Sequence, residues 1–155
     1  METLFRPFAI WSGFCLTLSM AFHCLALFDL IQVGDDLGFA FVVLSFLLIL
    51  PGQVILIIGA NGGELNVLRR RAPSGRAWRY LSSCLNCIPK VWRILGLSFW
   101  YVYMPVVGIV CVVRENTAAF FGLIVSAFFL LHFLAYQFVL PRRDELKCGV
   151  EKLPK

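Results

Sequence analysis

The chain has 155 residues, of which 60% are hydrophobic and 15% are charged, and its mean hydropathy is +0.83. Water-soluble domains are roughly 45–50% apolar and about 25% charged, so this composition excludes an ordinary water-soluble protein and indicates a membrane protein. The net charge of +5 does not indicate a nucleic-acid partner, because the chain holds no soluble domain that would carry a basic and aromatic binding surface.

Four apolar runs, taken in chain order, are each long enough to cross a bilayer, which requires about 20 apolar residues. They cover residues 8–31, 37–60, 91–113 and 117–140, and no acidic residue or lysine lies deep inside them. The first run is longer than the apolar core of a signal peptide, about 7–15 residues, so we interpret it as a span. The sequence therefore predicts an all-α, polytopic membrane protein in which residues 1–155 form one domain, a four-transmembrane-helix bundle.

The basic residues predict the orientation of this bundle. Most of them lie in the loop 61–90 and in the tail 141–155, whereas the only basic residue on the opposite side is Arg114. Cytoplasmic segments are enriched in Lys and Arg, so we expect both termini and the loop in the cytoplasm, and a bacterial inner or plasma membrane rather than an organelle. The same residues are expected to attract anionic membrane lipid. The expected outer loops, 32–36 and 114–116, are short enough to join the spans beside them as antiparallel hairpins.

The loop 61–90 also has the periodicity of a helix that lies on the membrane surface. On a wheel at 100° per residue, the polar side chains fall on one face: Arg76, Arg79, Ser82, Ser83, Asn86 and Lys90. The apolar side chains fall on the other face: Ala77, Trp78, Leu81, Cys84, Leu85 and Ile88. An amphipathic helix of this kind sinks its apolar face into lipid; the alternative is an ordinary loop packed under the bundle. We expect lipid or a partner to contact Arg69, Arg70, Arg71, Arg76, Trp78 and Arg79.

The stretch CLNC places Cys84 and Cys87 three residues apart, a spacing that metal sites and thiol oxidoreductases use. By the charge argument the pair lies in the cytoplasmic loop, where thiols are normally kept reduced. A structural zinc ion takes four ligands, and Cys148 would at best add a third. We therefore expect a structural role for the pair, without metal or cofactor. Acylation of one of the thiols is the alternative in a eukaryotic host.

The two histidines of the chain, His23 and His132, both lie inside spans, where an ionisable residue is a candidate functional site. Together with Gln53 they are the intramembrane polar candidates. Two histidines in a bundle can hold haem, but the expected depths of these two differ by roughly 10 Å at about 1.5 Å per residue. We expect each to bond a neighbouring helix instead. Pro51 and Pro105 are expected to kink the second and third spans.

Small residues recur at every fourth position in two of the spans. The first span carries Gly13, Thr17 and Ala21, and the fourth carries Gly122 and Ser126. Small residues at this spacing let two helices approach closely. The two stripes therefore predict either packing inside the bundle or an interface with a partner or a second copy.

No group of residues has the composition of a catalytic site, because the nine carboxylates lie in loops, at the termini or at span ends. We therefore expect no catalytic, cofactor-binding or metal-binding residues. The main hypothesis is a small non-enzymatic membrane protein that acts by contact with another protein in the bilayer, as an accessory subunit or an immunity or exclusion protein. A small oligomeric channel or transporter is the first alternative, and a membrane redox or haem-binding subunit is the second.

Overall fold

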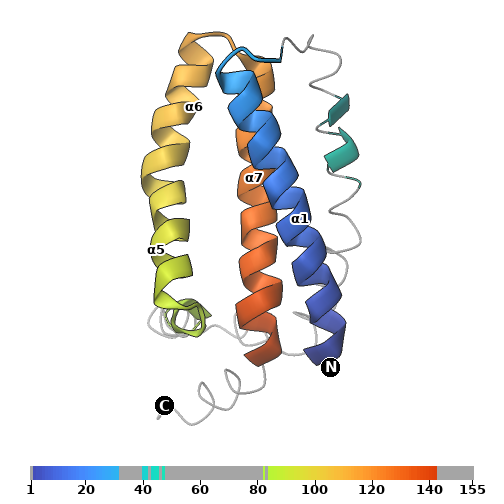
Figure 1. Cartoon of the computed structure of the whole chain (residues 1–155). Helices are drawn as coiled ribbons and strands as arrows, with labels where there is room; N and C mark the ends of the chain where they lie inside the picture. The colour runs from blue at the N-terminus through green and yellow to red at the C-terminus, as the bar shows by residue number, and fades with distance from the viewer. Residues whose placement is uncertain are drawn as a thin grey trace, which may run out of the picture.

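The computed structural model describes residues 2–31, 40–41, 43–45, 47, 82 and 84–142. These residues form helices and short turns, and none of them lies in a strand. The elements in chain order are α1 (Glu2–Leu27), α5 (Lys90–Ser98), the π-helix η1 (Phe99–Tyr103), α6 (Met104–Val113), α7 (Thr117–Leu134), the π-helix η2 (Ala135–Val139) and the 3-10 helix η3 (Leu140–Arg142) (Figure 1).

Three stretches of helix are long and apolar enough to cross a membrane: Phe5–Leu27, Lys90–Val113 and Thr117–Arg142. The second of them consists of α5, η1 and α6, and the third consists of α7, η2 and η3. The part of the chain that the structure describes is therefore all-helical, and its apolar helices are those of an integral membrane protein.

Several sequence predictions fall outside the described residues. Of the predicted second span, 37–60, six residues are described, and all six are helical. The loop 61–90 is described only near its end, and the tail 141–155 only in its first two residues. The candidate residues outside the described part are Gln53, Arg69, Arg70, Arg71, Arg76, Trp78 and Arg79, with Pro51 and Cys148.

The helix of the first span ends at Leu27, four residues earlier than predicted. The reason is the backbone of Asp29, whose φ of 56° lies in the left-handed region. The Leu30 amide donates to the Leu25 carbonyl at 2.9 Å, and the Asp29 amide donates to the Ala26 carbonyl at 3.1 Å. These two bonds form a Schellman motif, which satisfies carbonyls that a helix end leaves without partners.

The same motif ends α6 and confirms the predicted turn at 114–116. Glu115 has a φ of 53°. The Asn116 amide donates to the Cys111 carbonyl at 2.9 Å, and the Glu115 amide donates to the Val112 carbonyl at 3.1 Å. The chain thus reverses within three residues and enters α7 at the residue where the fourth span is predicted to begin.

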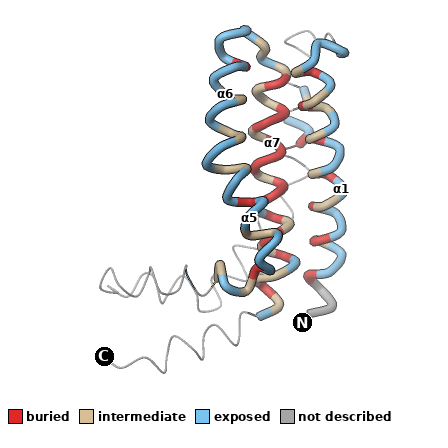
Figure 2. Tube along the Cα trace, turned by 60° about the vertical axis from the view of Figure 1, so that its left-hand side comes forward, coloured by how far each residue is buried: buried red, intermediate tan, exposed pale blue. Residues whose placement is uncertain are grey.

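The central helix of the described bundle is α7, and α1 runs antiparallel along it (Figure 1). The three spans differ in the buried share of an apolar stretch of 18 residues within each of them. This share is 61% for the span that begins with α7, 28% for α1 and 17% for the α5–α6 helix. Figure 2 shows the buried positions concentrated on α7. The buried residues of α1 are Phe5, Ala9, Ser12, Cys15, Ser19, His23 and Ala26. From Phe5 to Ala26 the buried positions cover 21 residues in six steps, so successive buried residues are on average 3.5 positions apart. This spacing is the period of helices that pack in a left-handed supercoil.

The predicted small-residue stripe of α1 is therefore displaced from the contact line with α7. Thr17 and Ala21 are exposed, and Gly13 lies at the edge of the contact, where an added Cβ would stand 3.3 Å from Phe133. The physical reason is that positions four apart drift around the helix, whereas alternating steps of three and four stay on one line. The stripe of α7 is predicted correctly, because Gly122 and Ser126 are both buried against α1.

The α5–α6 helix packs loosely at the side of this pair. Gly96 of α5 and Cys111 of α6 are its buried residues. Near one end, Trp92 lies with its ring centroid 5.1 Å from that of Phe133. Near the other end, Cys111 packs with small residues of α1 and α7. Between these two points most of the helix surface is apolar and exposed.

A π-helical turn, η1, widens this helix just before Pro105. The Met104 amide donates to the Phe99 carbonyl, five residues back, where an α-helix would bond four residues back. Because Pro105 has no amide proton to continue the α-helical ladder, the irregularity predicted at this proline takes the form of a wider turn. The turn ends at Tyr103, whose hydroxyl reaches α1.

The described end of the loop 61–90 lies against α7. Residues 84–87 are helical, and Leu85 and Ile88 pack in one apolar cluster with Leu130 and Leu134. The polar Asn86 is exposed and its side-chain oxygen accepts a hydrogen bond from Arg93 at 3.0 Å. In this described end the apolar side chains contact protein, as in the alternative of a loop packed under the bundle. The rest of the predicted surface helix lies outside the described residues.

Replacing Glu115 with glycine is expected to stabilise the fold by about 0.5–1 kcal/mol. A left-handed backbone costs a residue with a Cβ roughly 1–2 kcal/mol, and glycine avoids this cost. Part of the gain is offset, because glycine also increases the conformational entropy of the unfolded chain. Glu115→Ala is the matched control, because it removes the same charge and keeps the Cβ. Unfolding by denaturing detergent in micelles measures both variants, and equal stabilisation by alanine would contradict the backbone explanation.

Candidate functional site

A line of hydrogen-bonded polar side chains crosses the described bundle. We name it the polar seam, and its members are Ser19, His23, Tyr103, Asn116 and Ser126. They come from α1, η1, α7 and the turn that precedes α7. In a low-dielectric interior each of these groups is costly unless it is hydrogen-bonded, so their bonds decide what the seam can do.

His23 is fully buried and both of its ring nitrogens are bonded. Its Nδ1 lies 2.7 Å from the Ala119 carbonyl oxygen of α7. Because a carbonyl only accepts, Nδ1 carries a proton and donates. Its Nε2 lies 3.0 Å from the Tyr103 hydroxyl and, in the neutral ring, accepts from it. The prediction that His23 bonds a neighbouring helix is thus confirmed, and this one side chain links all three described spans.

At His23 the backbones of α1 and α7 come very close. A Cβ added to Gly122 would lie 3.0 Å from the His23 Cα and 3.1 Å from its Cβ. One turn further, the hydroxyls of Ser126 and Ser19 lie 3.0 Å apart. The Ser126 hydroxyl also lies 2.7 Å from the Gly122 carbonyl. The glycine and the serines thus combine close backbone approach with satisfied polar groups, as in other membrane helix pairs.

At the other end of the seam, Asn116 forms hydrogen bonds to both α1 and α7. Its side-chain oxygen accepts from the Ala119 amide at 3.0 Å, which caps the N-terminus of α7. Its side-chain nitrogen donates to the Ala26 carbonyl at 2.8 Å and lies 3.4 Å from an Asp29 oxygen. One residue therefore caps α7 and ties it to the end of α1.

The prediction that His132 bonds a neighbouring helix is wrong. Its Nδ1 lies 2.7 Å from the Phe128 carbonyl of its own helix, to which it donates. Its Nε2 is buried and has no hydrogen-bond partner. The ring lies beside Tyr136, with the centroids 6.1 Å apart. His132 is therefore a separate polar position outside the seam.

The positions of the two histidines do not suit a shared haem iron. His23 packs at the level of Gly122, and His132 lies ten residues further along α7, or about 15 Å at 1.5 Å per residue. Moreover, both nitrogens of His23 are bonded to protein groups. This geometry agrees with the depth mismatch that the sequence indicates.

Of the described cysteines, Cys15, Cys24, Cys87 and Cys111 are free thiols. Cys15 and Cys111 lie in apolar clusters, and Cys84 and Cys87 are half-buried. Within the described ranges no three side chains of His, Cys, Asp or Glu gather as metal ligands would. The polar groups of the seam therefore join helices. Sequence reasoning missed three of its members, Ser19, Tyr103 and Asn116. Tyr103 has no signal in sequence, whereas Asn116, placed just before an apolar run, has the signal of an N-cap.

The fold and site define an all-helical integral membrane protein whose spans are joined by buried hydrogen bonds. No family model, no curated protein and no solved structure matches the chain.

Replacing Gly122 with alanine is expected to destabilise the bundle by about 1–3 kcal/mol, the usual cost of overpacking a close contact. The added Cβ would meet the backbone of His23 at 3.0 Å, so the helices must separate. Gly108→Ala is the matched control, because its Cβ would lie at an ordinary contact distance, 3.8 Å, from a Leu123 methyl. Thermal unfolding in micelles measures both variants; equal losses would mean that close approach at Gly122 is not the cause.

Replacing Tyr103 with phenylalanine is expected to cost about 1 kcal/mol, because the buried Nε2 of His23 then loses its partner. Tyr101→Phe removes the same hydroxyl from a side chain that is 78% exposed and is expected to change stability little. Denaturing-detergent titration with both variants compares them directly. A loss as large for Tyr101→Phe as for Tyr103→Phe would contradict the assigned bond.

Proposed function

We propose that this protein acts without catalysis, by contact between its first span and another protein inside the bilayer. The role would be that of an accessory subunit or of an immunity or exclusion protein, and the partner would be another membrane protein or a second copy. In this proposal both termini lie in the cytoplasm, and the membrane is a bacterial inner or plasma membrane.

The observation that carries the proposal is the outer face of α1. Thr17 and Ala21 are exposed there, one helical turn apart on the same face. Apolar side chains stand around them, with Phe14 55% and Leu18 53% exposed. A pair of small residues flanked by large ones lets the backbone of another helix approach closely. The packing of α1 against α7 uses a different line of residues, so the described bundle leaves this face free for an intermolecular contact.

The polar group on this face is already satisfied. The Thr17 hydroxyl donates to the Gly13 carbonyl of the same helix at 3.0 Å. The face is therefore stable in lipid before any partner arrives, which suits a contact that forms and dissociates rather than an obligate assembly. The hydroxyl oxygen still has lone pairs that can accept a bond from a partner.

The hydrogen bonds within the polar seam support the same proposal. The ring nitrogens of His23 are bonded to Ala119 and Tyr103, and the serines and Asn116 bond across the described helices. Groups held in this way stabilise a bundle and position its outer surfaces. Neither a proton path nor an iron ligand is favoured by these bonds, so the described residues supply no specific observation for the channel and haem alternatives.

Ala21→Leu is expected to weaken the association about ten-fold, which corresponds to about 1.4 kcal/mol of lost helix contact. The test places a photo-crosslinking amino acid at Leu18 and measures protein adducts in the native membrane. The matched control is Ala40→Leu, the same change at another exposed alanine, for which the adduct yield should be unchanged. Adducts formed with lipid alone in the unsubstituted protein would overturn the proposal.

A further inference from the structure

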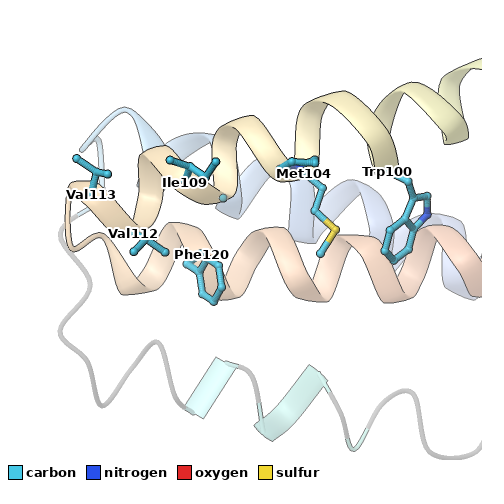
Figure 3. A pocket seen from close by; sticks show the side chains of 8 residues that line it. Trp100, Met104, Ile109, Val112, Val113 and Phe120 are labelled. Carbon is cyan, nitrogen blue, oxygen red and sulfur yellow. The ribbon is translucent and has the colours of Figure 1, made fainter.

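A groove runs along the side of the α5–α6 helix that turns towards α7. Its volume is about 470 Å³, and Figure 3 shows Met104 and Val112 on α6 beside Phe120 of α7. Its lining is wholly apolar in residue type: Trp100, Met104, Pro105, Gly108, Ile109, Val112, Val113 and Phe120. We refer to it as the α6 groove.

The missing side chain of Gly108 helps to form this groove. A Cβ at Gly108 would be 3.8 Å from a methyl of Leu123, an ordinary contact distance. A larger side chain at this position would therefore occupy space between α6 and α7 that is now open. The neighbouring Pro105 and the π-helical turn before it widen the same stretch of helix.

The length of the α6 groove matches one leaflet rather than the whole bilayer. From Trp100 to Val113 is 13 residues, or about 20 Å at 1.5 Å per residue, whereas the hydrocarbon core is about 30 Å thick. The helix continues from Trp100 to Lys90 without lining this groove. A transmembrane helix docked here would be expected to follow the whole span, whereas an acyl chain enters from one side and ends near the middle.

The end of the bundle beside Val113 carries charges of both signs. Arg114 directly follows Val113 and is exposed, and guanidinium binds phosphate in a bidentate geometry. Two exposed carboxylates, Asp29 and Glu115, are also at this end of the bundle. A phosphate together with an ammonium group complements this arrangement better than a phosphate alone.

We propose that the α6 groove is a binding site for one phospholipid of the leaflet at the α6–α7 turn, with an acyl chain beside Gly108 and its phosphate at Arg114. The carboxylates at the same end favour a zwitterionic amine head group, as in phosphatidylethanolamine. The site lies on α6 and α7 and is independent of the α1 face to which the proposed function is assigned.

The test uses the full chain in phosphatidylcholine nanodiscs with a trace of phosphatidylethanolamine that carries a diazirine on its acyl chain. After irradiation, mass spectrometry maps the labelled peptides. We expect saturable labelling between Trp100 and Val113 that unlabelled phosphatidylethanolamine displaces. Gly108→Leu should reduce this labelling at least about five-fold, because leucine fills the groove. Ile94→Phe, which adds bulk at an exposed position of the same helix outside the groove, should leave it unchanged.

Arg114→Gln tests the head-group contact independently of any folding defect at Gly108. It should raise the concentration of competitor needed for half displacement about three-fold or more, because one charge-assisted phosphate contact is lost. Labelling that rises linearly with probe and is not displaced would overturn the proposal, since it would report bulk lipid only. Equal displacement by diacylglycerol, which has no phosphate, would also overturn it. So would crosslinks between two copies of the chain at the groove, since a second protein would then occupy it.

Discussion

The close approach of α1 and α7 at Gly122 is the constraint on which the rest of the described structure depends. In a bilayer, association between helices gains little from the hydrophobic effect, because lipid tails are as apolar as the side chains that they replace. Close packing and hydrogen bonds must supply the difference. Gly122 lets the backbone of His23 approach to the contact limit, and at that distance the imidazole reaches the Ala119 carbonyl of the partner helix.

The third described span depends on this pair through a single polar contact in its middle. The bond between His23 and Tyr103 joins the α5–α6 helix to α1, and the remaining contacts are apolar, among them those of Trp92, Phe99 and Cys111. The wider turn of η1 before Pro105 ends at the tyrosine that makes the bond. This loosely packed helix leaves apolar surface open beside it, and the α6 groove is part of that surface.

The polar seam and the outer face of α1 lie on different sides of this helix. The groups of the seam lie between helices, where Ser19, Ser126 and Asn116 bond from one helix to another. Two of the small residues, Thr17 and Ala21, remain on the outside. An unsatisfied polar group on a lipid-facing surface costs free energy, and the exposed Thr17 hydroxyl avoids this cost by donating to the Gly13 carbonyl.

The sequence by itself determined the class of the protein, the helical spans at 91–113 and 117–140, and the tight turn between them, because apolar length and local turn chemistry are properties of the chain alone. It also indicated Gly122 and Ser126 as packing residues and His23 as a bonded histidine. Only the tertiary structure decided that α1 is the main neighbour of α7, which line of α1 meets it, and that Tyr103 rather than His132 completes the polar seam. The physical reason is that apolar residues lie on both the buried and the lipid-facing sides of these helices. Hydropathy therefore does not distinguish the two sides, and the choice between them rests on how two surfaces fit together.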